Sequence, residues 1–165
     1  MITPDAIHRH FPSLETKCYL NTAAEGIPPL AVGAALTAYW QDKLLGMDGR
    51  EAHFAQESSA RGHAARLLGL GESEVGFCSC SAEAYNLLAT ALQLAEGDEV
   101  VISDIDFPSG FTPWVQGNSP VTTRLWESRD GSLAVSDLAA LLGPQTRLVQ
   151  VSLVSFYNGF RIPWD

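Results

Sequence analysis

The sequence predicts an α/β protein in which N-terminal helices precede a mostly parallel sheet with crossover helices. Two observations carry this prediction. From Glu74 onward, short runs rich in β-branched residues alternate with segments of helical periodicity. Before Glu74, apolar residues recur mainly at helical spacing. We therefore divide the chain into an N-terminal segment with helices, residues 1–73, and an α/β domain that begins at residue 74 and runs to residue 165.

The N-terminal segment contains signals for three helices. Thr3 and Pro4 predict the start of a short helix over 3–11, because threonine is a good N-cap and proline fits the first turn. Longer helices are predicted over about 29–45 and about 50–68, the second ended by Gly69. Cys18–Asn21 is predicted to be extended, and the prolines and Gly26 that follow prevent a regular element.

The α/β domain is predicted to alternate strands with helices. The expected strands are residues 75–78, 99–103, 121–125 and 147–153, and the expected helices are 82–95, 110–116 and 136–142. Connections of this kind are right-handed and place the strands parallel. Ligands of such sheets bind at the carboxyl ends of the strands.

Composition limits the classes of function. The 165 residues carry a formal net charge of −9, and the few Lys and Arg residues are scattered, which argues against a nucleic-acid or anionic-membrane surface. No secretory signal or membrane-length apolar run is visible, and three cysteines in no disulfide-framework spacing favour a reducing cytoplasm. Cys78 and Cys80 have no second Cys/His cluster, so we expect small buried thiols rather than a metal pair.

The turn between the predicted strand at 75–78 and the following helix is the most informative segment. Ser79 and Ser81 stand where a helix N-cap belongs, and no bulky side chain covers the junction. Unpaired N–H groups at a helix start, together with the helix dipole, suit a phosphate. Small residues can also serve only to let a strand and a helix pack tightly, so this turn alone does not decide.

Two further loops follow strand ends and are predicted to meet that turn at one edge of the sheet. They are the segments 104–109 and 152–159, which carry acidic, aromatic and small polar residues. Phe107 is either a core residue or a pocket wall, and its place between Asp106 and Pro108 favours the wall. Together the three loops predict a pocket for a flat, phosphorylated molecule.

Five motifs in order give the chain a resemblance to a known family. They are Tyr19–Gly26, Cys78–Leu88, Gly97–Ser103, Asp106–Ser109, and Thr146–Val149 with Asn158-Gly159. Together they resemble the class V aminotransferase family, which includes cysteine desulfurases, kynureninase-like lyases and isopenicillin-N-epimerase-like proteins. Its members are fold-type I enzymes that use pyridoxal 5′-phosphate (PLP). The resemblance implies that residues 74–165 are an incomplete cofactor-binding large domain.

The resemblance also assigns expected roles to single residues. Ser81 and Ala82 match the pair that holds the cofactor phosphate through backbone N–H groups, although the family usually has Thr at the second position. Phe107 matches the aromatic residue, often His, that stacks on the pyridine ring. Phe156 stands where desulfurases place an Asn against the cofactor, and Ser155 or Asn158 is expected to substitute for that contact. The alternative for Asn158, which precedes Gly159, is that it only shapes a turn.

The catalytic residues of the family have no counterpart in this sequence. The lysines are Lys17 and Lys43, away from any family-like lysine motif, and Asp165 is not the aspartate that pairs with the pyridinium. We therefore expect the N-terminal part of a longer enzyme, inactive alone, whose parent acts on an amino acid or amine as a homodimer.

The sequence is compatible with more than one reaction and with two other classes of protein. The reaction of the parent enzyme is a transamination, an elimination or a desulfuration. A non-catalytic fragment is one alternative. Another is an α/β domain that binds nucleotide or phosphate without PLP, although the dinucleotide and P-loop glycine motifs are absent from the sequence.

Overall fold

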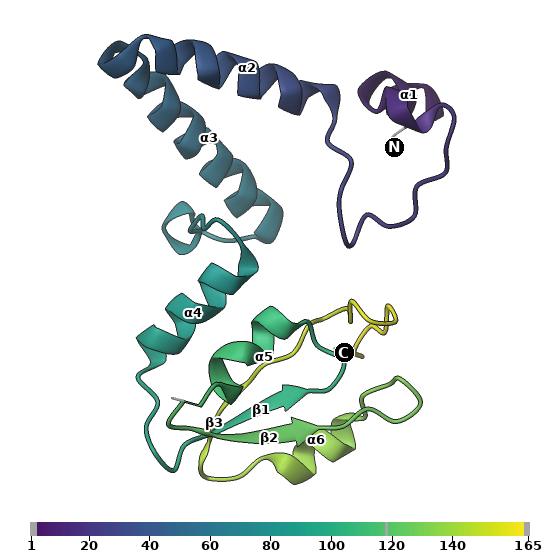
Figure 1. The fold of residues 1–165 in the computed structure, drawn as a ribbon, viewed down its shortest axis with the longest axis vertical. Helices are drawn as coiled ribbons and strands as arrows, with labels where there is room; N and C mark the ends of the chain where they lie inside the picture. Colours follow the sequence, from purple (N-terminus) through teal and green to yellow (C-terminus); the bar gives the residue numbers. More distant parts are fainter. Residues whose placement is uncertain (1–2, 118, 164–165) are drawn as a thin grey trace. The chain divides into compact units, whose positions relative to one another are not determined.

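A computed structural model describes residues 3–117 and 119–163, and the chain divides into two compact units, Met1–Phe77 and Cys78–Asp165 (Figure 1). The sequence places a boundary between residues 73 and 74, where it predicts that a cofactor-binding domain begins. That domain assignment stays a prediction.

The N-terminal unit is helical, as predicted. Its helices are α1 (Pro4–His10), α2 (Leu30–Leu44) and α3 (Arg50–Leu68), with short 3₁₀ turns at Pro12–Leu14, Gly46–Gly49 and Glu72–Glu74. The Thr3 hydroxyl caps α1 by accepting a hydrogen bond from Ala6 N at 3.2 Å. Gly69 ends α3 in the left-handed conformation, with φ 70°. Both helix boundaries confirm the predicted capping residues.

The turn between α2 and α3 depends on a close backbone approach. A Cβ at Gly49 would lie 1.9 Å from the carbonyl oxygen of Asp42. Only glycine fits there without moving the backbone. Beyond the turn, the rings of Tyr39 on α2 and His53 on α3 lie 4.6 Å apart, so the two helices form a hairpin.

The strand predicted at 75–78 is wrong. Residues 75–78 have no regular secondary structure. The carbonyl oxygen of Val75 accepts a hydrogen bond from Arg61 Nη1 at 2.6 Å instead of from a neighbouring strand, and the Phe77 ring lies 5.7 Å from the Arg61 guanidinium carbon. Val75 is buried, but α3 supplies its polar partner. A β-branched and aromatic run without a partner strand does not form a ladder.

The second unit contains the parallel sheet that the sequence predicts. Its strands are β1 (Glu99–Ser103), β2 (Thr122–Trp126) and β3 (Thr146–Val149), in the order β2-β1-β3 and parallel at both pairings. The helices α4 (Ser81–Leu92), α5 (Pro108–Val115) and α6 (Val135–Leu141) precede or connect the strands (Figure 1). β3 is shorter than predicted, because the chain leaves the ladder after Val149.

Both faces of the sheet are covered, as the parallel arrangement requires. Val101 on the central strand faces one apolar cluster, and its neighbours Val100 and Ile102 face the other. The first cluster packs against α6 through Leu138 and Leu141. The second contains Trp114 of α5. The rigid centre of this unit is therefore β1, whose carboxyl end leads to the candidate site.

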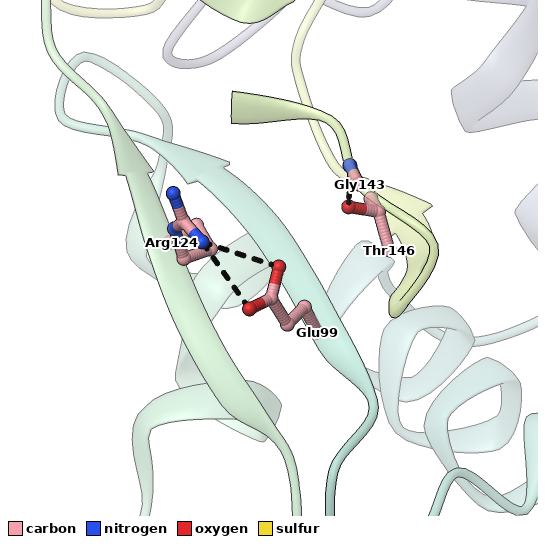
Figure 2. A network of polar contacts seen from close by, with 4 residues as sticks. All are labelled: Glu99, Arg124, Gly143 and Thr146. Atoms are coloured by element: carbon pink, nitrogen blue, oxygen red, sulfur yellow. Dashed lines mark hydrogen bonds and ion pairs between the residues drawn. The ribbon is translucent and has the colours of Figure 1, made fainter. Parts of the chain in front are cut away.

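Polar contacts hold the amino-terminal part of the sheet. Arg124 of β2 donates to both carboxylate oxygens of Glu99 on β1, at 3.2 and 3.4 Å, and the Thr146 hydroxyl accepts from Gly143 N at 2.9 Å (Figure 2). Both contacts lie near the strand starts, opposite the edge where ligands of parallel sheets bind.

The three cysteines are free and exposed, so the prediction of small buried thiols is wrong. Cys78 and Cys80 lie in the irregular segment before α4 rather than at the end of a buried strand. Among the described residues, no helix is long and apolar enough to cross a membrane, and no group of three or more His, Cys, Asp or Glu side chains is arranged to hold a metal ion.

Candidate functional site

Two aspartates join the carboxyl ends of the three strands. Asp104 follows β1 and accepts hydrogen bonds from the backbone N–H and the hydroxyl of Ser128, which lies just after β2, at 2.9 and 3.0 Å. Asp106 makes the corresponding connection to the segment after β3. The loop that leaves the central strand is therefore tied to both of its neighbours.

The carboxylate of Asp106 is buried and accepts four hydrogen bonds. Its Oδ1 accepts from Phe107 N at 2.8 Å and from the Ser152 hydroxyl at 2.5 Å, and its Oδ2 accepts from Gln150 Nε2 at 3.0 Å and Ser152 N at 3.1 Å. Gln150 is itself buried. The sequence alone did not give Asp106 a role, because it stands three residues after the end of β1 and its partners Gln150 and Ser152 are far away in the sequence.

Phe107 lies at the surface of this edge. Its ring contacts the Phe156 ring edge to face, with centroids 4.9 Å apart and planes at 82°. The two residues are 51% and 54% exposed, so the alternative that Phe107 is a core residue is wrong. The two rings come from the loops after β1 and β3 and present an open aromatic surface.

The start of α4 offers unpaired N–H groups. Cys80 precedes the helix in an extended conformation, and the first intrahelical bond runs from Ala84 N to Cys80 O. The N–H groups of Ser81, Ala82 and Glu83 have no oxygen acceptor in the described part of the chain. These are the donors that any helix leaves free at its first turn.

This helix start lies beside the loop that carries Phe107. The Ser81 and Ser109 hydroxyl oxygens are 3.4 Å apart, and Ser109 stands in the first turn of α5, two residues after Phe107. The structure therefore brings the predicted phosphate seat and the predicted stacking residue onto adjoining segments.

Two pKa shifts show that this corner stabilises negative charge. The pKa of the Cys80 thiol is lowered, mainly by the N–H of Glu83 and then by the Ser79 hydroxyl and the N–H of Ala82, although the sulfur makes no cap hydrogen bond of normal geometry. The pKa of the Glu83 carboxyl is lowered by the N–H and the hydroxyl of Ser79, and Ser79 N donates to Glu83 Oε2 at 2.5 Å. Because Ser79 N already binds Glu83, an anionic ligand at this corner would use the N–H groups of Ser81 and Ala82, which have no oxygen acceptor among the described residues.

The polar atoms of Ser155 and Asn158 shape the loop after β3. The buried Ser155 hydroxyl donates to Ile105 O at 2.7 Å and accepts from Tyr157 N at 3.1 Å. Asn158 donates to Gly131 O at 2.7 Å and accepts from Phe160 N at 2.9 Å. These contacts give both side chains a structural role, and their expected contact with a cofactor stays a prediction.

Comparison with known families follows the same order of segments. Residues 18–165 match the model of the family described as aminotransferase class-V. The chain belongs to this family. The resemblance carried by the five motifs is thereby confirmed at the level of the family.

The curated relatives are longer than this chain. It is 27% identical over 157 residues to a probable cysteine desulfurase of Methanothermobacter thermautotrophicus, covering 90% of this chain and 39% of that protein. It is 27% identical to an uncharacterized aminotransferase, YcbU, of Bacillus subtilis, covering 95% of this chain and 42% of that protein. The chain thus spans about two fifths of the length of these two relatives.

Solved structures share the fold. A mutant of the protein C-DES with glycine covalently linked to its PLP cofactor matches 98% of this chain and 44% of its own, with a TM-score of 0.85 and 23% identity. A cysteine desulfurase from Escherichia coli matches 98% of this chain and 44% of its own, with a TM-score of 0.78 and 21% identity. The predicted α/β fold with a parallel sheet is confirmed.

Proposed function

We propose that this chain is the N-terminal part of a PLP-dependent class V enzyme that acts at Cα or Cβ of an amino acid. The observation that carries the proposal is the pairing of free N–H groups at the start of α4 with the half-exposed Phe107 ring on the adjoining loop. Membership of the family and the PLP named for a structure of the same fold support it.

The residues of this chain bind and orient the cofactor in this proposal. The N–H groups of Ser81 and Ala82 would donate to the phosphate, with the Ser81 hydroxyl as a further donor. Ala82 has no hydroxyl, so backbone donors would carry most of that contact. Phe107 would stack on the ring of the cofactor, but it has no group to transfer a proton. When bound, PLP stabilises negative charge at the substrate Cα.

We assign bond breaking to residues outside this chain. Lys17 and Lys43, its two lysines, stand outside the loops that form the candidate site. The proposed substrate class is an amino acid or amine, and the parent reaction is a transamination, a lyase reaction or a desulfuration. The relatives named as cysteine desulfurases and as an aminotransferase support this range. We further propose a cytoplasmic homodimer, which the free cysteines and the family resemblance support.

The test is to titrate PLP into the full-length protein and to monitor binding by the visible absorbance of PLP. The wild-type protein is compared with a variant that lacks one proposed donor. Ser81→Pro removes the N–H and hydroxyl at the first helical position, where proline is tolerated and the extended Cys80 precedes it. Because a hydrogen bond to a charged group is worth about 1.5–3 kcal/mol, we expect PLP affinity to fall by about 10-fold or more.

Two control variants separate the possible causes. Ser81→Ala keeps the N–H and removes the hydroxyl, so its loss should be smaller than that of Ser81→Pro. Val135→Pro places proline at the first position of α6 and should leave PLP affinity unchanged. Absence of any protein-bound PLP band in the wild-type protein, or equal affinity in Ser81→Pro and Val135→Pro, would contradict the proposal.

A further inference from the structure

The hydrogen-bond partners of Asp106 are all donors. Two backbone N–H groups, one amide NH₂ and one hydroxyl surround its two carboxylate oxygens. A carboxylate accepts at about four lone-pair positions, so its capacity is filled. The residue is 4% exposed, so the carboxylate is bound by protein donors within the fold. This arrangement fits a carboxylate and no neutral side chain of the same size.

We propose that Asp106 is a positioning residue that sets the orientation of the Phe107 ring against Phe156, and thereby the aromatic face that holds the cofactor. The second half of this proposal rests on the function proposed above. The first half concerns the protein alone and can be tested without any ligand.

The backbone of Phe107 is fixed at both ends. Its N–H donates to Asp106 Oδ1, and its carbonyl oxygen accepts from Gly110 N at 2.9 Å. Pro108 follows and restricts the conformation of Phe107 to the extended region that it adopts, with φ −71° and ψ 140°. The ring itself is half exposed, so packing alone constrains it little. The Asp106 carboxylate, which also binds Gln150 and Ser152, therefore ties the backbone of Phe107 to the segment after β3.

The partner ring depends on the same loop. Phe156 stands between Ser155, whose hydroxyl donates to Ile105 O, and Tyr157, whose N–H donates to that hydroxyl. Asp106 then holds Ser152 on the same segment through two hydrogen bonds. Loss of the carboxylate would remove the contacts of this loop with Gln150 and Ser152 and leave the Ser155–Ile105 hydrogen bond to join the two loops. We therefore expect the 4.9 Å contact between the two rings to loosen.

Asp104 provides a matched control on the same loop. It is also an aspartate after β1, but it accepts from Ser128 on the side of β2. Asp104→Asn and Asp106→Asn make the same chemical change two residues apart. In Asp106→Asn, the new NH₂ group faces donors, and at least one buried donor loses its acceptor.

The primary measurement is the ¹⁹F chemical shift of 4-fluorophenylalanine placed at position 107 in the cofactor-free, full-length protein. The neighbouring Phe156 ring gives this probe a shift different from that of an exposed phenylalanine. We expect Asp106→Asn to move the resonance toward the exposed value and Asp104→Asn to leave it in place. Ser152→Ala, which removes one donor, should produce a smaller change in the same direction.

PLP affinity and the induced circular dichroism per bound PLP form the second measurement. We expect Asp106→Asn to weaken PLP by about 10-fold or more and to reduce the induced signal, with Asp104→Asn within about 2-fold of wild type. An unchanged ¹⁹F shift in Asp106→Asn overturns the proposal. If that variant does not fold, an unchanged shift in Ser152→Ala overturns it. A wild-type protein that shows the ¹⁹F pattern and binds no PLP contradicts the proposed function while supporting the positioning role.

Discussion

At the residue scale, the start of α4 combines the negative carboxylate of Glu83 with N–H groups that could bind an anion. Glu83 places a carboxylate in the first turn, where it would repel a phosphate, but its oxygen is bound to Ser79 N rather than to the free donors. Its lowered pKa means that it stabilises the folded state above its ordinary pKa, and that this contribution is lost as pH falls through the folded value. The N–H groups of Ser81 and Ala82 have no oxygen acceptor among the described residues, although the N–H of Ala82 also lowers the pKa of the Cys80 thiol.

Gly110 shows how tightly the Asp106 network is packed. A Cβ there would lie 2.6 Å from Gln150 Nε2 and 3.2 Å from its Cδ. Overpacking costs about 1–3 kcal/mol, and helix propensity returns up to about 1 kcal/mol, so we expect Gly110→Ala to lose about 1 kcal/mol net.

Urea unfolding of the full-length protein measures this change, and a second helical glycine is the control. A Cβ at Gly33 in α2 meets no atom within 4 Å, so Gly33→Ala should gain about 0.5–1 kcal/mol from reduced backbone entropy. If Gly110→Ala is as stable as Gly33→Ala, the side chain of Gln150 is not held as the structure shows.

At the element scale, two buried tryptophans secure opposite faces of the sheet with different chemistry. Trp126 at the end of β2 is 1% exposed, and its Nε1 donates to Ala134 O, just before α6, at 3.1 Å. Trp114 of α5 is 4% exposed, and its Nε1 has no partner among the described residues. We expect Trp126→Phe to cost about 1–2 kcal/mol more than Trp114→Phe, because it leaves the Ala134 carbonyl unpaired.

The two variants are compared by urea unfolding of the same full-length protein. Both substitutions remove the same indole atoms from a buried position, so the cavity terms largely cancel in the difference. Equal losses in the two variants would show that the Trp126 hydrogen bond contributes nothing to the attachment of α6.

A comparison of individual elements shows which parts of the fold can be predicted from local sequence. Glu99–Ser103 is correct as a strand because its apolar run is buried on both faces. The sequence predicts that the last strand continues over residues 150–153. In the structure, Ser152 N instead donates to the Asp106 side chain, 46 positions earlier. The family motifs pointed to Ser81, Ala82 and Phe107. The network behind Phe107 joins residues far apart in sequence, and no local pattern specifies it.

At the scale of the whole molecule, the amount of exposed apolar surface is the informative quantity. α2 has no buried residue. Its large exposed side chains are Leu30, Val32, Leu36, Tyr39, Trp40 and Leu44. Large apolar side chains that are exposed together on one helix mark a surface that another segment or chain covers. The chain spans about two fifths of its relatives' length, so further polypeptide and a second copy are both available occupants in the parent protein that we propose.

We therefore expect residues 1–165, expressed alone, to form dimers or larger assemblies, whereas the full-length protein gives a single defined species. Light scattering after size exclusion, over a range of concentrations, measures this difference. Leu36→Gln with Trp40→Gln removes two exposed apolar side chains of α2, and it should raise the monomer fraction of the isolated chain. The same pair of changes at exposed, charged positions such as Glu51 and Arg66 should not. A wild-type 165-residue chain that stays monomeric at high concentration would mean that this surface needs no cover, because its burial would then bring too little hydrophobic free energy to offset the entropy of association.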